Sequence, residues 1–160
     1  MGWVAIVGSR ELISRLTLPR PSREEAASHA LGGGGGDAVE SPNDFSGECG
    51  RIRRYFAGHP VTFSCELDIS AHTPFRRAVW SVVRGIPYAE TRTYQWVAEQ
   101  TGRIRGARAV GQALGSNPVP VIVPCHRVVQ SDGCPGGFSL GSRWKRILLE
   151  MEQGQRAVQR

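Results

Sequence analysis

The chain has 160 residues, 40% of them hydrophobic and 21% charged, and its formal net charge at pH 7 is +6. This length allows one or two domains with a buried core, and the sequence has no run of about 18 apolar residues that would cross a membrane. The N-terminus lacks a basic segment followed by a long apolar core, and the four cysteines show no CxxC spacing, so we expect no secretory signal, no membrane association and reduced thiols in a cytoplasmic protein.

The charge is unevenly distributed along the chain. Residues 1–71 contain 7 Arg against 9 Asp and Glu, whereas residues 72–152 contain 11 Lys and Arg against 5 Asp and Glu. Nearly all of these cations are arginines, which suit bidentate contacts with phosphates and bases. Charge alone leaves two interpretations open, a nucleic-acid interface and a solvated basic surface.

A β-hairpin and a helix are predicted at the start of the chain. Apolar residues at 2–7 and 12–18 flank a short polar turn, which is typical of two paired strands. Ser22 followed by Glu25 three residues later forms a capping box, and it predicts a short helix that ends near Leu31.

A long insertion and a further strand are predicted next. The glycine tract at 32–36 opens a polar, turn-forming segment that reaches about residue 50, and a short helix follows to residue 57. Apolar and polar residues alternate over Val61–Ser70, which predicts a strand with one buried face and places Cys65 in the core. These elements predict a small α/β domain without recognisable chemistry.

Helical periodicity begins at Thr73. Thr73 is predicted to cap a helix with Pro74 at its first position, and Gly85 is predicted to end it. The period of the apolar residues predicts a buried stripe on this helix. Its members are Phe75, Ala78, Val79, Val82 and Val83.

Two shorter helices are predicted to follow. Thr93 is placed to cap the first, at 94–100, and the second covers 107–114, where Gly115 ends it. Two short helices separated by a turn that contains glycine predict a helix-turn-helix motif. An ordinary packed helix pair has the same pattern and remains an alternative.

Small residues surround one arginine on the second of these short helices. The small residues are Gly106, Ala107, Ala109 and Gly111, and Arg108 projects from among them. In one interpretation the small residues let the helix enter a narrow groove while the arginine acts as a wedge. In the other, the helix packs tightly against a neighbouring helix and the arginine is merely exposed.

A cysteine lies directly beside a histidine in the segment 117–128, NPVPVIVPCHRV. The three prolines and the apolar residues before the cysteine predict a rigid, buried strut. Cys125 is therefore a candidate nucleophile, with His126 as the base that activates it directly or through a bridging water. The alternative is a buried structural thiol, whereas a metal pair is excluded because adjacent Cys and His residues need a second pair elsewhere to hold one ion.

The C-terminal segment combines a glycine-rich loop at 134–141 with a last helix that Ser142 is predicted to cap. The loop backbone can approach a flat ligand closely, and Phe138 is placed to cover it. The predicted buried stripe of the helix contains Trp144, Ile147, Leu148 and Met151. Glu152 lies at the edge of this stripe and needs a partner, so we expect it to orient His126, as in a Cys-His-Glu triad; the alternative is a solvated Glu at a fraying helix end.

The sequence Pro124-Cys125-His126-Arg127-Val128 resembles the O6-alkylguanine-DNA alkyltransferases. Asn117-Pro118 before it and the sequence Ala107-Arg108-Ala109-Val110-Gly111 carry the same resemblance. The similarity covers about residues 73–153 with every element in order, while the N-terminal half matches only in layout.

The resemblance implies a fold of two domains. Residues 1–71 are expected to form a small α/β domain with a ribonuclease-H-like layout and a glycine-rich insertion at about 32–50. Residues 72–153 are expected to form a mainly α, winged helix-turn-helix-like alkyltransferase domain, and residues 154–160 a tail.

The resemblance also implies DNA repair by direct reversal of damage. Such proteins move the alkyl group from O6-methylguanine in duplex DNA irreversibly onto a cysteine after the base has left the stack, and O4-methylthymine is a second candidate substrate. The implied partner is double-stranded DNA that contains O6-alkylguanine, and no cofactor is implied. We expect a monomer in the cytoplasm, associated with the nucleoid in a prokaryote.

Four catalytic residues follow from the resemblance: Cys125, His126, Glu152 and Tyr94. The residues implied to contact the DNA or the flipped base are Arg108, Ala107, Ala109, Gly111, Asn117, Val128, Phe138 and Ser139. In this pattern Arg108 fills the space that the base leaves, and Tyr94 crowds the neighbouring phosphate and protonates guanine N3. Asn117 ties the two active-site segments together.

The remaining implied roles belong to the backbone and to Arg127. The carbonyl groups of Cys125 and Val128 would hold the guanine amino group, and the backbone N–H of Ser139 would face O6. Arg127 would brace the segment through hydrogen bonds. Leu140 stands where some family members have glycine, and we expect it to narrow the pocket.

Several alternatives stay open beside the resemblance. A zinc site is not expected, because the residues His29, Cys49, His59 and Cys65 match no zinc-binding spacing. A relative that binds alkylated DNA without transfer would lack the cysteine, which is present here. A Cys-His-Glu hydrolase and a plain winged-helix DNA-binding protein are the other rivals. Cys134 adds a further thiol near the expected site.

Overall fold

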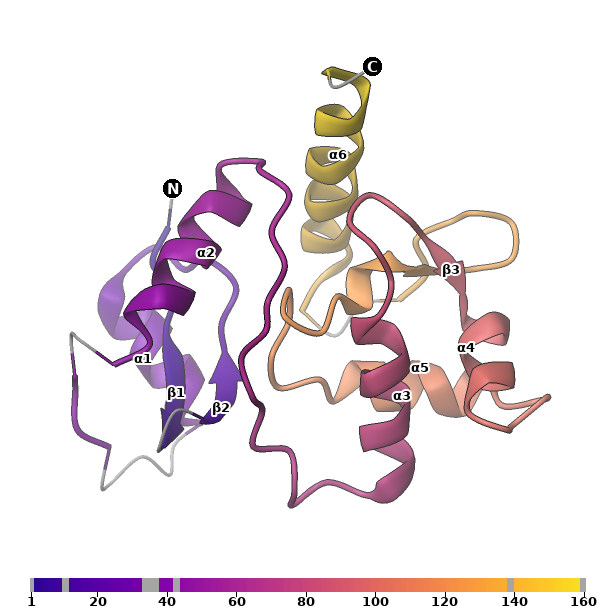
Figure 1. Cartoon of the computed structure of the whole chain (residues 1–160), viewed down its shortest axis with the longest axis horizontal. Helices are drawn as coiled ribbons and strands as arrows, with labels where there is room; N and C mark the ends of the chain where they lie inside the picture. The colour runs from indigo at the N-terminus through magenta and orange to yellow at the C-terminus, as the bar shows by residue number, and fades with distance from the viewer. Residues whose placement is uncertain (1, 10–11, 33–37, 42–43, 138–139, 159–160) are drawn as a thin grey trace.

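The structure, a computed structural model, describes residues 2–9, 12–32, 38–41, 44–137 and 140–158. In chain order its elements are β1 (Ile6–Ser9), β2 (Leu12–Leu16), α1 (Arg23–Leu31), α2 (Ser46–Phe56), α3 (Pro74–Arg84), β3 (Arg92–Thr93), α4 (Tyr94–Gln100), α5 (Ala107–Gly115), the 3-10 helix η1 (Cys125–Arg127), β4 (Val128–Val129) and α6 (Ser142–Val158). An N-terminal part with β1, β2, α1 and α2 lies beside a C-terminal part with α3, α4 and α5, and α6 rises at their junction (Figure 1).

The predicted hairpin and first helix are both formed. β1 and β2 pair antiparallel, with Ile6 opposite Leu16. The side chain of Ser22 accepts a hydrogen bond of 3.1 Å from the backbone N–H of Glu25, as the capping box predicts. α1 ends at Leu31 and is capped by Gly32, whose φ of 60° is readily adopted by glycine.

α2 begins earlier than we expected. It starts at Ser46, so the insertion that was predicted to reach residue 50 is shorter. Phe45, with a φ of 56°, precedes the helix and packs against the core. The first turn of α2, residues 46–49, has no large apolar side chain and therefore carries no hydrophobic period, which explains why the sequence did not reveal it.

The predicted strand at Val61–Ser70 was wrong. Its side chains do alternate between half-buried and exposed, but among the described residues its pairing is limited to an isolated parallel bridge between Leu67 and Ile13. The backbone N–H of Ile13 donates to Glu66, and that of Asp68 donates to Ile13, at 3.0 and 2.9 Å. Alternation requires only a surface to lie against, whereas a strand needs a neighbour in register over several residues.

The three helices predicted after Thr73 are confirmed. The hydroxyl of Thr73 accepts from the backbone of Arg76, and α3 ends before Gly85 as expected. The hydroxyl of Thr93 accepts from the backbone of Trp96 at 3.0 Å, and α4 has the predicted bounds. α5 includes one residue more than predicted at its C-terminal end.

The buried stripes of α3 and α6 each differ from the prediction by one residue. In α3, Ala78 is exposed and Trp80 is buried, and the indole Nε1 of Trp80 donates to the carbonyl of Ala113 at 2.9 Å. In α6, Ile147 is exposed and Lys145 is fully buried. Hydropathy alone misses such residues, because their polar atoms find partners inside the protein.

α6 extends beyond the helix that the sequence predicted. Ser142 is its first residue and not its cap, and the helix continues to Val158. Most of the segment 154–160, which we expected to be a tail, is therefore helical. Phe138 and Ser139, in the loop before α6, lie outside the described residues.

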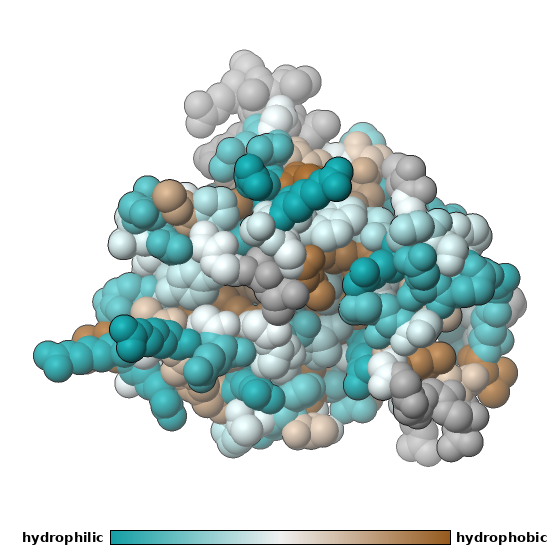
Figure 2. Space-filling model, turned by 180° about the vertical axis from the view of Figure 1, so that it is seen from behind, coloured by the Kyte–Doolittle hydropathy of each residue, from teal (hydrophilic) through white to brown (hydrophobic). Residues whose placement is uncertain are grey.

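Polar residues dominate the surface. The rear face carries mainly hydrophilic side chains, and the hydrophobic areas on it are small and separate (Figure 2). Among the described residues, the exposed large hydrophobic side chains are Trp3, Val39, Ile104 and Ile147. None of the helices in the described ranges is long and apolar enough to span a membrane.

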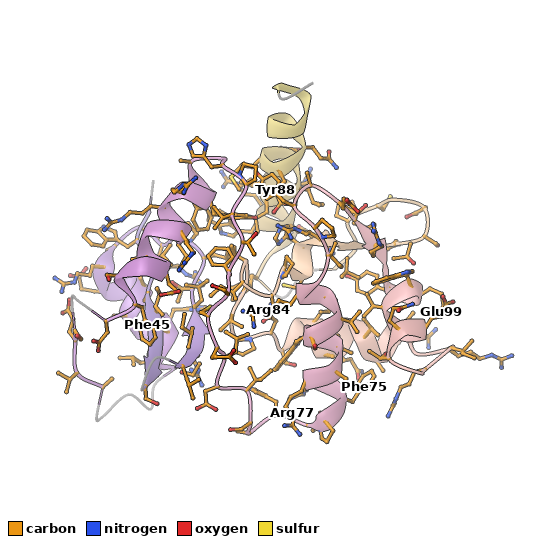
Figure 3. All side chains as sticks on the ribbon, in the orientation of Figure 1. Phe45, Phe75, Arg77, Arg84, Tyr88 and Glu99 are labelled. Carbon is orange, nitrogen blue, oxygen red and sulfur yellow. The ribbon has the colours of Figure 1, made fainter. Side chains whose placement is uncertain are left out.

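The hydrophobic core is continuous across the predicted domain boundary at 71–72, which itself stays a prediction. The backbone N–H of Leu16 donates to the carbonyl of Pro118 at 2.9 Å and thereby joins β2 to the strut before Cys125. Arg84, which lies between the two parts (Figure 3), donates from Nη2 to the carbonyls of Phe63 and Cys65 at 3.0 and 2.5 Å. These contacts hold the N-terminal part against the helices that carry the site.

Replacing Arg84 with methionine should destabilise the protein. The carbonyls of Phe63 and Cys65 would lose a charged donor, which we expect to lower the free energy of unfolding by about 1–3 kcal/mol. Denaturant titration measures this change. The control is Arg77→Met, on the exposed face of the same helix, which should alter stability by no more than about 0.5 kcal/mol. Equal losses in both variants would show that the carbonyl contacts of Arg84 contribute nothing.

Candidate active site

The segment before Cys125 is the rigid, buried strut that the sequence predicted. All residues from Val119 to Val129 are buried. The backbone N–H of Val123 donates to Val119 at 2.9 Å, and that of Cys125 donates to Val123 at 2.8 Å. Val121 has a φ of +75°, which a β-branched residue adopts only where its surroundings hold it. The strut thus fixes the position of the cysteine that follows it.

Asn117 connects both ends of this strut. Its Nδ2 donates to the carbonyl of Val123 at 2.9 Å and lies 3.1 Å from the Sγ of Cys125, and its Oδ1 accepts from the backbone of Val119. Burial raises the pKa of the Cys125 thiol, while the hydrogen bond from Asn117 and the nearby charge of Lys145 act in the opposite direction. At rest, this thiol is protonated and sits next to donors that can stabilise a thiolate.

Glu152 is bound to His126, as we predicted. Its Oε1 lies 2.8 Å from Nε2 of His126, and both side chains are almost fully buried. Arg127 donates to the same carboxylate from Nε and Nη2, each at 3.0 Å, and from Nη1 to the carbonyl of Ile86 at 2.6 Å. The bracing role expected for Arg127 is therefore present in the structure.

Further donors hold the carboxylate of Glu152. The backbone N–H of Ala89 donates to Oε2 at 3.0 Å, and Ala89 has a φ of +59°, an uncommon conformation for alanine. Tyr55 of α2 donates to Oε1 at 2.6 Å. Burial opposes ionisation of Glu152, but the hydrogen bonds from His126 and Arg127 outweigh it and lower its pKa to about 2. This carboxylate is charged throughout the physiological range.

The state of His126 follows from its partner. Burial lowers the pKa of His126 despite the nearby carboxylate, so the imidazole is neutral at rest. An ionised carboxylate only accepts hydrogen bonds, so the proton of the neutral ring belongs on Nε2. Nδ1 is buried and has no hydrogen-bond partner within the described ranges. It is therefore the nitrogen that can take a proton from the neighbouring thiol.

Lys145 is a site residue that our sequence reasoning missed. It is fully buried, and its Nζ donates to the carbonyl of Val128 at 2.6 Å and to the hydroxyl of Tyr94 at 3.1 Å. Burial lowers the pKa of Lys145 to about 8, while Cys125 acts to raise it. A signal was available: Lys145 is the only lysine in the sequence and lies three residues before the buried Leu148, on the same helix face.

Tyr94 joins the lysine to the glycine-rich loop. Its hydroxyl donates to the carbonyl of Gly137 at 3.3 Å, and a Cβ at Gly136 would come within 3.5 Å of its ring. Burial, and to a lesser extent Cys125, raises the pKa of Tyr94. The tyrosine is thus a protonated donor with a cation 3.1 Å from its oxygen.

A cavity of about 410 Å³ opens above Cys125. The residues that line it are Tyr94, Ala107, Arg108, Gly111, Leu114, Gly115, Cys125, Gln130 and Gly137. The structure therefore brings most of the predicted residues together, with Arg108 exposed beside the cavity. Ala109 is half-buried and does not line it, and Leu140, which we expected to narrow the pocket, packs against the core.

Two of the residues predicted to contact the base cannot be placed in the site. Phe138 and Ser139 lie outside the described residues. The carbonyls predicted to hold a base, those of Cys125 and Val128, already accept hydrogen bonds from the backbone of Val128 and from Lys145, respectively. Each carbonyl oxygen retains a second lone pair for a ligand.

The arrangement is suited to nucleophilic attack on a compact ligand. A thiol lies in the wall of the cavity, a neutral base adjoins it, and Tyr94 with Lys145 supplies a proton donor to the same space. None of the described residues forms a cluster of three or more His, Cys, Asp or Glu side chains that would hold a metal ion.

Comparisons with known proteins agree with this chemistry. The family model described as "6-O-methylguanine DNA methyltransferase, DNA binding domain" matches residues 74–154. A curated Mycobacterium tuberculosis protein named methylated-DNA–protein-cysteine methyltransferase is 36% identical over 155 residues, covering 97% of this chain and 88% of the relative. A Methanosarcina barkeri protein of the same name is 38% identical over 117 residues, covering 73% of each chain.

Solved structures resemble the whole fold. A crystal structure of Mycobacterium tuberculosis OGT in complex with DNA superposes with a TM-score of 0.79 at 37% identity, covering 95% of this chain and 87% of the other. The O6-methylguanine-DNA methyltransferase of Pyrococcus kodakaraensis gives a TM-score of 0.65 at 25% identity, covering 94% and 90%. The similarity thus includes the N-terminal part, for which the sequence had given only a layout.

Replacing Glu152 with glutamine should change how stability depends on pH. Glu152 has a pKa of about 2 in the folded protein against an ordinary value of 4.5, so its charge stabilises the fold above about pH 4.5, and this contribution is lost as the pH falls toward 2. Over this range we expect the wild type to lose about 3 kcal/mol more than Glu152→Gln. Denaturant titrations at several pH values measure the difference.

The control for this experiment is the exposed Glu150 on the same helix. Glu150→Gln should keep the pH dependence of the wild type. An equally steep loss of stability in Glu152→Gln and in the wild type would contradict the assignment of a lowered pKa to Glu152.

Proposed function

The chain belongs to the family of O6-methylguanine-DNA methyltransferases, and on this premise we propose that Cys125 accepts the alkyl group from O6 of guanine in duplex DNA. The protein repairs DNA by direct reversal of damage, and each molecule acts once, because the alkyl group stays on the protein. The assignment of Cys125 rests on one observation: its Sγ accepts a hydrogen bond of 3.1 Å from Asn117 and lies beside the cavity that Tyr94 and Arg108 line.

The transfer begins with loss of the thiol proton. Nδ1 of His126 takes it directly or through a bridging water, and Glu152 stabilises the resulting imidazolium. The sulfur then attacks the alkyl carbon in line with the C–O bond, forming a C–S bond while the electrons of the broken bond pass to the guanine. Holding the two reacting atoms in this geometry can supply roughly 7–11 kcal/mol of the barrier reduction.

The leaving guanine needs a proton. We assign this donation to the hydroxyl of Tyr94, toward guanine N3, as the family resemblance implies. Lys145, at 3.1 Å, stabilises the phenolate that forms and can return a proton to it. The products are S-alkylcysteine and unmodified guanine, with no oxidant, reductant or cofactor consumed.

DNA engagement is assigned to the α4–α5 pair as a winged helix-turn-helix-like unit. The small residues Ala107, Ala109 and Gly111 would let α5 approach the minor groove, and Arg108 would occupy the space of the flipped base. The cavity beneath Arg108 has room for a base, which supports this role. Val128, Phe138 and Ser139 keep the base contacts that the family resemblance implies.

The N-terminal part completes the proposed architecture. A ribonuclease-H-like layout is our interpretation of the antiparallel hairpin followed by α1 and α2. We further propose that the protein is a cytoplasmic monomer, associated with the nucleoid in a prokaryote.

A protein that binds alkylated DNA without transfer is the second candidate. The buried Cys125, the neutral His126 and the charged Glu152 favour transfer, since a binding protein needs none of them. A Cys-His-Glu hydrolase would turn over many substrates and would not depend on DNA.

The mass of the protein after reaction tests the proposed function. Incubation with duplex DNA containing O6-methylguanine should add the mass of one methylene group, and peptide analysis should locate it on Cys125. Cys125→Ala should gain nothing, whereas Cys134→Ala, which removes an exposed thiol outside the cavity lining, should react like the wild type. Tight binding without a mass gain would favour the non-transferring alternative, and multiple turnovers would favour the hydrolase.

The wedge role of Arg108 can be separated from the chemistry. Arg108→Ala should slow repair of duplex DNA at least tenfold more than its reaction with free O6-benzylguanine, because the free base needs no flipping, and unstacking costs a few kcal/mol, of which about 1.4 kcal/mol is tenfold in rate. Single-turnover kinetics on both substrates measure the ratio. Arg105→Ala, in the exposed turn before α5, is the charge-matched control and should leave the ratio near that of the wild type. Equal losses on both substrates would refute the wedge.

A further inference from the structure

Tyr55 reaches the His126–Glu152 pair from the N-terminal part of the chain. It lies in α2, its side chain is fully buried, and its hydroxyl donates to Oε1 of Glu152 at 2.6 Å. The same hydroxyl oxygen is 3.1 Å from Nε2 of His126. Position 55 lies outside residues 74–154, which match the family model. The base of the proposed reaction is thus in contact with a residue outside the matched region.

The hydroxyl of Tyr55 stays protonated in this environment. Burial and the charge of Glu152 raise the pKa of Tyr55 far above its ordinary value. Because the ionised carboxylate only accepts hydrogen bonds, its Oε1 receives one each from the hydroxyl of Tyr55, from Nε2 of His126 and from Nη2 of Arg127. The tyrosine therefore shares the oxygen that the histidine depends on.

We propose that Tyr55 is a positioning residue for alkyl transfer. By donating to Oε1 of Glu152, it weakens the stabilisation that the carboxylate gives to the imidazolium form of His126, and it thereby keeps Nδ1 free to accept the proton of Cys125. This inference rests on the proposed function. Without the hydroxyl, Oε1 carries more unbalanced negative charge and favours the imidazolium form of His126. An imidazolium has no lone pair and cannot accept the thiol proton, so activation would require a higher pH.

The other charged groups around His126 do not change with Tyr55. Glu152 and Lys145 face it from α6, and Arg127 faces it from η1, with Glu152 favouring and the two cations opposing its protonation. Tyr88, which packs edge-on against Tyr55 at 6.2 Å, lies against the guanidinium of Arg127. A shift in the titration of His126 on removal of one hydroxyl is therefore attributable to that hydroxyl.

A packing role for Tyr55 is the alternative. Its ring makes edge contacts with Phe56 and His126, with centroids 5.4 and 6.4 Å apart, and phenylalanine keeps that ring. Tyr55→Phe consequently removes the hydrogen bond and leaves the packing. Tyr88→Phe is the matched control, because the hydroxyl of Tyr88 donates to the carbonyl of Gly58 at 3.0 Å and not to Glu152.

Single-turnover transfer from O6-methylguanine duplex DNA, measured from acid to alkaline pH, tests the proposal. Tyr55→Phe should move the midpoint of the rising limb up by about one pH unit, the effect of losing one hydrogen bond to a charged group. Below both midpoints the variant should be about tenfold slower than the wild type, and well above them the two rates should converge. Tyr88→Phe should keep the wild-type midpoint. A rate lowered uniformly, with the midpoint unmoved, would overturn the proposal.

A double variant shows whether Tyr55 acts through the carboxylate. In a Glu152→Gln background, Tyr55→Phe should no longer shift the midpoint, because the charge that it modulates is gone. A shift of the same size in that background would contradict the assignment.

The wild-type protein supplies a test that does not depend on the variants folding. Nitrogen NMR of the His126 ring should show the proton on Nε2 and a bare Nδ1, and the opposite tautomer would overturn the proposal. If the wild type failed to transfer the methyl group at all, the proposed function would fail, while the NMR tautomer would still decide the contact that Tyr55 makes.

Discussion

The buried charge of Glu152 is the constraint on which the site depends. A carboxylate with 1% exposure must be compensated, since an unpaired buried ion costs several kcal/mol. Here the compensation comes from His126, Tyr55, Arg127 and the backbone of Ala89. These donors come from three segments that are far apart in the sequence, around residues 55, 89 and 126–127, and all of them bind the same two oxygens. The geometry around Cys125 follows from satisfying that one charge.

The same constraint explains the unusual backbone near the site. Ala89 adopts a positive φ and donates its N–H to Glu152, and Val121 adopts one in the strut that ends at Cys125. Such conformations cost about 1–3 kcal/mol each and persist only where the surroundings determine them. Asn117 supplies that determination for the strut, because its amide connects Val119, Val123 and the thiol. Rigidity is therefore built from both ends of the segment.

Local signals in the sequence predicted the C-terminal helices well, whereas contacts over long distances were missed. The caps at Thr73 and Thr93 depend on neighbours three residues away, so a short stretch of sequence is enough to predict them. Tyr55 lies 97 residues before Glu152, and the sequence suggested no role for it, because nothing local distinguishes a buried donor from a core aromatic residue. Lys145 was missed for a related reason, since hydropathy places lysine on the surface. The prediction of a strand at Val61–Ser70 was wrong because a strand needs a neighbouring strand in register, and the sequence of one segment does not show whether such a neighbour exists.

In the proposed reaction the thiol of Cys125 is used once, so it benefits from being unreactive until its substrate arrives. Burial raises the pKa of Cys125, and His126 beside it is neutral, so the resting pair carries no charge that would attract solvent electrophiles or metal ions. The charges that can stabilise the transfer, Glu152 on one side and Lys145 on the other, are already in place and compensated. Because these groups are already in position, the transfer requires little reorganisation of the surroundings of the thiol. The neighbouring groups, and not the resting thiol, thus determine when the cysteine becomes reactive. This suits a protein for which every unintended modification is a permanent loss.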